Sequence, residues 1–235
     1  MSESFTTKMI MESIDLLKIV AAVCALAIAI IGHEIMHGLV AFMYGDTTAK
    51  DAKRLSLNPL VHVDPVGTLL VPALMYFVPM LLGAGGGFLF GWAKPVPING
   101  AKVLQNGGYN ALMKVDLAGI FYNFALASFA SFVLFHMPKP IESDSIFYIF
   151  GYILVLQLVI INVVLGVFNL LPIPQFDGAQ FLTHLSLKHN IYKVAHFYQK
   201  YDRYGILVVL LIIATPLKDY LLFMPVQFIL GLLSP

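Results

Sequence analysis

The chain has 235 residues, of which 59% are hydrophobic and 11% are charged, and its formal net charge is +1. Soluble domains carry about 25% charged residues, so this composition excludes an ordinary soluble enzyme and predicts a polytopic membrane protein. A near-neutral chain without a basic tail gives no reason to expect a nucleic-acid partner, and the single cysteine, Cys24, excludes an intrachain disulfide.

The first predicted element is a membrane span at Ile19–Tyr44, which follows a short interfacial lead-in at Met1–Lys18. The lead-in lacks the basic start and small-residue cleavage site of a signal peptide. Within the span, His33, Glu34 and His37 form an HExxH motif flanked by apolar residues. Ionisable groups at membrane depth are costly and usually mark a working site.

The spacing of the motif indicates a metal site. Two histidines four residues apart lie on one face of a helix and can bind one metal ion. Glu34 then stands beside that ion, where a general base is needed. A helix of a soluble metalloprotease or a chance match in a core helix would give the same letters, but the apolar flanks argue against both.

A re-entrant element is expected after this span. Basic residues collect on the cytoplasmic side of membranes, and their distribution places both 45–65 and 94–114 there. The chain between them must therefore enter the membrane and return. Val66–Leu82 is apolar enough to enter, Gly83–Gly87 breaks a helix, and Phe88–Pro97 is typical of an extended return. A simple helical hairpin with a glycine turn is the alternative.

The rest of the chain completes an all-α polytopic membrane protein of about five to six membrane segments, with the partly extended element after the HExxH span. We expect residues 1–235 to form a single membrane-embedded domain. Its core is about 19–180 and its C-terminal membrane segments about 204–233, where Thr215–Tyr220 indicates a hairpin or a broken helix. The later apolar stretches are Val115–Phe135, Phe147–Leu170 and Ile206–Leu233, with 136–146 outside and 171–203 inside.

A catalytic zinc usually has three protein ligands and one open position, so one ligand is still to be found. The extended HExxHxxGxxH pattern would place a histidine at Met43, and the only later glutamate, Glu142, lies on the outer link. Asp177 remains, in a helix-breaking segment of prolines and glycine at the inner end of a span. Three other polar groups lie near the inner end of the first span: Asp46, His62 and Asp64.

Together these motifs resemble the site-2 protease family of intramembrane metalloproteases. The resemblance covers most of Ile19–Gln180 and rests on HEIMH, on Ala118-Gly119 with Asn123 in a middle span, and on NLLPIPQFDG, residues 169–178. It implies one zinc ion per chain, bound by His33, His37 and Asp177, with Glu34 as the catalytic base. The middle motif reads AGIFYN, where the family commonly has a proline after the glycine.

The resemblance also implies a function. The expected activity is that of a zinc metalloendopeptidase that cuts single-span membrane proteins within the lipid bilayer, near the cytoplasmic face, in regulated intramembrane proteolysis. No PDZ domain or regulatory module fits in this chain. We expect a multi-pass protein of a prokaryotic plasma (inner) membrane, with its active site toward the cytoplasm. The alternative is a zinc-binding transporter or a catalytically inactive scaffold, because transporters also keep such residues at mid-membrane.

Three further residues have two interpretations each. Asn169 can bind an extended substrate backbone, as the resemblance suggests, or cap carbonyls freed around Pro172. Asn123 can face the site and bind substrate, or bond a neighbouring helix, which we favour. His62, with Asp64, can act as an outer partner of the site or in an oxyanion pair, or can be an ordinary surface histidine.

Overall fold

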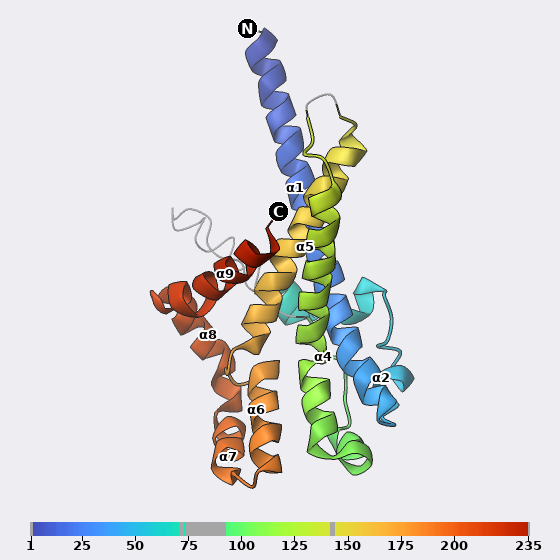
Figure 1. Ribbon diagram of the computed structural model, residues 1–235, viewed down its shortest axis with the longest axis vertical. Coiled ribbons are helices and arrows are strands. Elements are labelled where there is room, and N and C mark those ends of the chain that lie inside the picture. Colours follow the sequence, from blue (N-terminus) through green and yellow to red (C-terminus); the bar gives the residue numbers. More distant parts are fainter. Residues whose placement is uncertain (1, 71–72, 74–92, 142–143, 235) are drawn as a thin grey trace.

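The computed structural model describes residues 2–70, 73, 93–141 and 144–234, and these form a helical protein without a strand in the described part (Figure 1). Three helices are long and apolar enough to cross a membrane: α1 (Ser2–Met43, with Ile14–Met43 as the span), α4 (Gly100–His136) and α5 (Ile146–Leu170). A bent pair at the C-terminus can add a fourth. The predicted helical membrane class is confirmed. The described residues hold three candidate spans, or four with the bent pair, and the predicted total of five to six segments stays a prediction.

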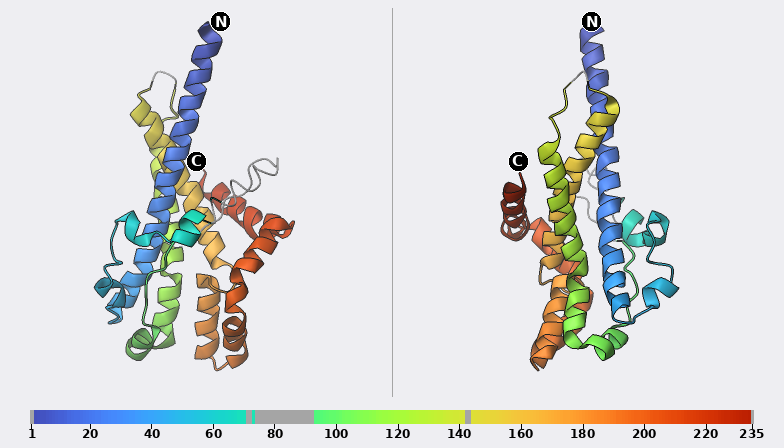
Figure 2. Two further views of the ribbon diagram at one scale, coloured as in Figure 1. Left: turned by 180° about the vertical axis from the view of Figure 1, so that it is seen from behind. Right: turned by 45° about the vertical axis from the view of Figure 1, so that its right-hand side comes forward.

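The span α1 lies against α4 and α5 (Figure 2). A line of small residues on α1 permits this close packing. Ala21, Ala25 and Ala29 are fully buried at intervals of four residues, which puts them on one face of the helix. Gly32 continues the line, because a Cβ there would lie 2.0 Å from the Tyr122 ring of α4. Small residues let membrane helices approach closely. The predicted lead-in is not a separate element, since the helix continues unbroken from Ser2.

Helix α4 begins at Gly100, well before the predicted start at Val115, because the side chain of Asn99 accepts a hydrogen bond from the Lys102 amide. It is interrupted at Gly108, whose φ of 66° and ψ of −167° suit only glycine. The first turns therefore leave the line of the span. The predicted inner segment 94–114 is thus largely helical.

Helix α5 agrees with the predicted span and ends before Pro172, which cannot continue a helix. Helices α6 (Asp177–Lys188) and α7 (Tyr192–Tyr201) then lie side by side at the end of the molecule opposite the N-terminus (Figure 1). The shorter elements are α2 (Thr48–Asp51), η1 (Pro59–His62), η2 (Pro65–Leu70), η3 (Asp202–Tyr204) and η4 (Asp219–Phe223).

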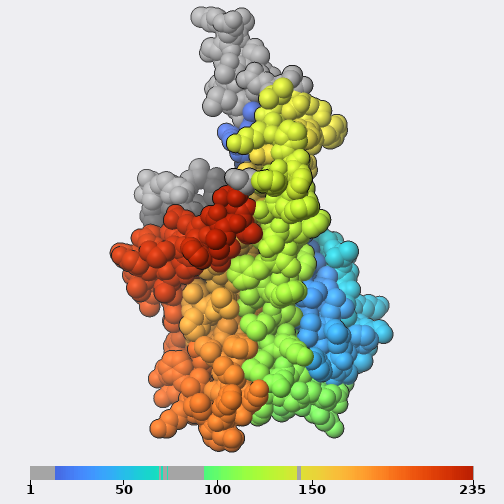
Figure 3. All heavy atoms as spheres, in the orientation of Figure 1, coloured from blue at the N-terminus to red at the C-terminus, as the bar shows by residue number. Residues whose placement is uncertain are grey.

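The C-terminal stretch is a sharply bent helix pair, which agrees with the predicted break. The segment Tyr192–Ala214, which includes α8 (Gly205–Ala214), makes an angle of 96° with Asp219–Leu233, which includes α9 (Met224–Leu233). The bend occurs around Pro216. Val226 of α9 is buried against Val163 and Val167 of α5, so α9 lies across that span (Figure 3).

Most of the predicted re-entrant element, including the glycine run, lies outside the described residues. At its start, Pro65–Leu70 forms a π-helical turn. At its end, residues 93–99 are irregular and lie along α1, where the Val96 amide donates to Glu34 and the Lys94 amide to the carbonyl of His62.

Asp46 holds the end of α1 to the start of α4. Its side chain is 1% exposed, and it accepts hydrogen bonds from the backbone and hydroxyl of Thr48 and from the Asn99 amide at 2.6 Å. Burial raises the pKa of Asp46, but the hydrogen bonds from Thr48 and Asn99 outweigh it, so the pKa lies below its ordinary value.

We expect Asp46→Asn to lower the stability of the detergent-solubilised protein by about 1–3 kcal/mol, because one buried donor loses its acceptor. A carboxyl whose pKa is depressed in the fold stabilises it above its ordinary pKa of 3.8 and loses that effect as the pH falls further. The difference between wild type and Asp46→Asn in thermal unfolding should therefore shrink below that pH. A difference that stays constant with pH would contradict this assignment.

Candidate metal centre

The structure brings His33, His37 and Asp177 together at one point. The two histidines lie one turn apart on α1, and Asp177 is the first residue of α6. Oδ2 of Asp177 lies 3.2 Å from Nε2 of His33 and 3.3 Å from Nε2 of His37, and the two Nε2 atoms are 3.1 Å apart. Both imidazoles are buried. Three ligand atoms from two distant segments thus form a compact triangle.

The segment before Asp177 explains how this aspartate reaches the helix of the histidines. Pro172 and Pro174 break the helical path after α5, and Gln175 takes a left-handed conformation with φ of 76°. Gly178 then permits close contact, because a Cβ there would lie 2.3 Å from the carbonyl oxygen of Leu170. The chain therefore reverses tightly, and α6 starts beside the end of α5.

The second nitrogen of each imidazole is held by α4. Nδ1 of His33 lies 2.7 Å from Oδ1 of Asn123, and Nδ1 of His37 lies 2.7 Å from the carbonyl oxygen of Val115. Both partners are acceptors, so each Nδ1 carries the proton and each Nε2 presents a lone pair. This is the arrangement by which outer partners orient metal-binding histidines.

The three groups fit a zinc ion. Two lone pairs and a carboxylate oxygen point at one another, and Oδ2 of Asp177 is buried without a hydrogen-bond donor among the described residues. Without a cation this arrangement is repulsive. Zinc bonds of about 2.0–2.1 Å place tetrahedral ligand atoms roughly 3.3–3.4 Å apart, close to the distances of 3.1–3.3 Å in this triangle.

Glu34 lies next to this triangle on α1 and is half-buried. Its Oε2 accepts a hydrogen bond of 2.8 Å from the Val96 amide. Among the described residues no hydrogen bond to Oε1 occurs, so one carboxylate oxygen is held and the other is free to exchange a proton. The segment around Val96 thereby connects the end of the predicted re-entrant element with the predicted base.

The less specific candidates lie in different places. Asn123 is 0% exposed, and its amide nitrogen donates to Asn162 of α5 and to the Ala29 carbonyl of α1. Asn123 therefore stands behind His33, and the substrate-binding interpretation has no exposed group to support it. Asn169 is half-buried, and its amide donates to the Leu165 carbonyl one turn earlier within α5. Both interpretations of Asn169 therefore stay predictions.

His62 is 3% exposed, so it is not an ordinary surface histidine. Its Nε2 lies 2.8 Å from the carbonyl oxygen of Ser56, and within the described part of the chain its buried Nδ1 has no partner. The carbonyl of His62 accepts a hydrogen bond from the amide of Lys94, two residues from Val96. Among the described residues, His62 has no hydrogen bond to a metal ligand.

Sequence reasoning missed two contributors, the Val115 carbonyl and Asn162, and did not foresee the contacts of Gly119. The Val115 carbonyl could not be found, because a backbone group leaves no trace in the sequence. Gly119 belonged to a recognised motif, but its contact with both imidazoles depends on helix packing. Asn162 had a signal, since it is an amide in an otherwise apolar stretch and is fully buried.

Comparison with known proteins agrees with this geometry. Peptidase family M50 matches residues 138–213, the region that contains Asp177. The chain is also 33% identical over 209 residues to the protein named "Putative zinc metalloprotease YwhC" of Bacillus subtilis (strain 168). The aligned region covers 85% of this chain and 83% of that protein. The chain belongs to peptidase family M50, the site-2 protease family. No solved structure matches it.

Membership of family M50 supports a zinc metalloprotease and disfavours a transporter. The histidine motif lies outside the matched residues 138–213, yet the fold places it against the aspartate that lies within them. The region that matches the family and the histidine motif outside it thus meet at one centre.

Gly119→Ala tests the packing at this centre. A Cβ at Gly119 would lie 2.5 Å from both His33 Nδ1 and His37 Nε2, so the imidazoles must move. We expect zinc affinity to fall at least about tenfold, as for other changes around metal-bound histidines, in competition with a chelator. Gly151→Ala is the matched control, because its Cβ would meet no described atom within 4 Å. Equal affinities of the two variants would contradict the geometry.

Proposed function

We propose that this protein is an intramembrane zinc endopeptidase that cuts membrane-spanning segments of single-span substrate proteins near the cytoplasmic face. The observation that carries the proposal is the triangle of His33, His37 and Asp177 between apolar helices, with Glu34 beside it. One zinc ion per chain fits the three ligand atoms. Membership of family M50 supports a role of this protein in regulated intramembrane proteolysis, and that role is part of the same proposal.

Separate residues would bind the metal and transfer the proton. His33, His37 and Asp177 would hold the zinc, which when bound supplies a Lewis acid and in such sites lowers the pKa of water to about 7. Glu34 accepts a proton from the attacking water through its free oxygen and returns it to the leaving nitrogen of the peptide. The Val96 amide keeps the other oxygen of Glu34 in place throughout.

The substrate must unwind locally, because a membrane helix hides its carbonyl groups in hydrogen bonds. Pairing with an extended edge near Phe88–Val96 would satisfy the exposed groups, but residues 88–92 lie outside the described part. In the described part, Lys94 and Val96 already donate their amides within the protein, and Pro95 and Pro97 have none. Pairing there would have to use carbonyl oxygens as acceptors.

The proposed orientation rests on charge. Basic residues in 45–65, 94–114 and 171–203 favour the cytoplasmic side for the end of the molecule where α6 and α7 lie. Asp177 opens α6 at that end, which would put the site toward the cytoplasm and give it access to water. A prokaryotic plasma membrane, with the substrates embedded in the same bilayer, completes the proposal.

Glu34→Gln separates chemistry from metal binding. The amide keeps the size of the side chain but cannot accept a proton, so cleavage of a model single-span substrate in detergent should fall by about 10²–10⁴-fold. Zinc content, measured on the same preparation, should stay at one ion per chain. A chelator should abolish cleavage by wild type, and added zinc should restore it.

His33→Ala is the matched variant, because it removes a ligand and keeps the base. Its zinc content and its cleavage should fall together, whereas in Glu34→Gln only cleavage falls. Normal turnover by Glu34→Gln, or zinc bound without chelator-sensitive cleavage in wild type, would instead support the transporter or scaffold.

A further inference from the structure

A second buried pair of ionisable groups lies outside the ligand set. Nδ1 of His184, on α6, is 2.6 Å from Oδ2 of Asp116, on α4. The Asp116 side chain is 9% exposed and that of His184 is 20% exposed. Burying a carboxylate is costly unless it is paired. The proposed chemistry gives neither residue a role, although the chain keeps both within its interior.

The position of His184 connects the pair to the metal centre. His184 follows Asp177 by seven residues on the same helix, about two turns, so both side chains lie on one face of α6. That face meets α4. The hydrogen bond to Asp116 therefore holds the face of α6 that also presents the third ligand.

On the side of α4, the pair completes a series of contacts. Asn123 holds His33, and the carbonyl of Val115 holds His37. Asp116 directly follows Val115, and its carboxylate holds His184 and through it the helix of Asp177. One face region of α4 thus contacts every element that carries a ligand, and the third ligand is the one it reaches indirectly.

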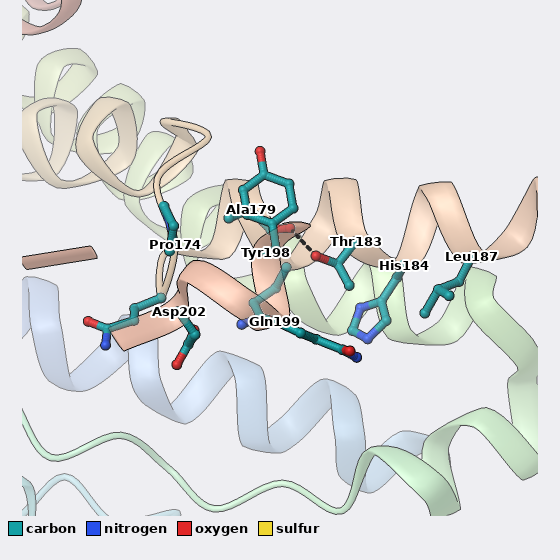
Figure 4. A pocket seen from close by; sticks show the side chains of 10 residues that line it. Pro174, Ala179, Thr183, His184, Leu187, Tyr198, Gln199 and Asp202 are labelled. Carbon is teal, nitrogen blue, oxygen red and sulfur yellow. Dashed lines mark hydrogen bonds between the residues drawn. The ribbon is translucent and has the colours of Figure 1, made fainter. Parts of the chain in front are cut away.

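The outer side of His184 borders a cavity of about 370 Å³ between α6 and α7 (Figure 4). Thr183 and Leu187 of α6 also line this cavity, and Tyr198 and Gln199 line it from α7. Water in this cavity can satisfy the second ring nitrogen. The imidazole can therefore keep its bond to Asp116 without burying an unpaired polar atom.

We propose that Asp116 and His184 are positioning residues for the third metal ligand: their hydrogen bond sets the rotation and depth of α6 against α4, and so the place of Asp177 beside the two histidines. This inference rests on the proposed zinc site and adds to it a structural requirement. An apolar side chain at position 184 would contact α4 without a preferred direction. The hydrogen bond between His184 and Asp116 is directional, so it fixes the orientation of α6 against α4.

The test compares His184→Asn with His184→Leu, two side chains that branch at Cγ and have the same number of heavy atoms. The asparagine amide can donate to Asp116 from close to the place of Nδ1, and leucine cannot. Zinc affinity, measured by competition with a chelator, should stay within about twofold of wild type in His184→Asn. Zinc affinity should fall about tenfold in His184→Leu. This is the lower end of the loss found when a hydrogen-bond partner of a metal ligand is removed, and the loss is small because the pair does not touch the ion.

The absorption spectrum of the cobalt-substituted protein gives a second readout, because it reports ligand geometry. We expect it to change in His184→Leu and not in His184→Asn. Lys188→Ala is the control, since Lys188 makes the exposed contact between the same helices, at 2.7 Å from Asn110, and exposed contacts contribute little. If His184→Leu does not fold, Asp116→Asn combined with His184→Leu removes the unpaired carboxylate and should show the same loss.

The outcomes separate the two proposals. Wild-type zinc affinity and an unchanged cobalt spectrum in His184→Leu or its double variant would overturn the positioning role and leave the proposed protease intact. An equal loss in His184→Asn and His184→Leu would also overturn it. Wild-type protein that binds no stoichiometric zinc would overturn the proposed function itself, with this inference.

Discussion

The structure depends on one unfavourable contact that a cation would turn into a favourable one. Two imidazole lone pairs and a carboxylate oxygen meet at 3.1–3.3 Å in an apolar bundle. In low dielectric such a cluster repels strongly, so the surrounding fold must hold it. Proton placement on both Nδ1 atoms, set by Asn123 and Val115, ensures that the lone pairs point inward rather than away.

Helix α4 supplies most of the contacts that hold the three ligand side chains in place. Gly119 leaves room for both imidazoles, Asn123 joins α1 to α5 through Asn162, and Asp116 reaches α6. Because lipid gives helices no hydrophobic reason to associate with one another, close packing and buried hydrogen bonds must hold the bundle together. The polar groups of α4 thus serve assembly and metal geometry at once.

The base is held from the opposite direction. Arg54 donates to the carbonyl of Lys94 at 2.6 Å, and the Lys94 amide donates to the carbonyl of His62 at 2.9 Å. The segment so fixed presents the Val96 amide to Glu34. His33, Glu34 and His37 share α1, but their hydrogen-bond partners come from separate parts of the chain. Helix α4 holds the two histidines, and the segment fixed by Arg54 and His62 holds Glu34.

The sequence by itself determined the helical membrane class, the apolar spans within α1 and α5, the break near Pro216, and the placement of His33 and His37 on one helix face, because hydrophobic length and helical spacing are local properties. Elimination also pointed to Asp177. Only the tertiary structure decided that Asp177 meets both histidines, that Asn123 stands behind His33, that His62 is buried, and that Asp116 binds His184. The residue pairs among these contacts are separated by 68 to 144 residues in the chain. Other contacts depend on backbone carbonyls and on the space left by glycines. Contacts of both kinds leave no periodic signal in a single sequence.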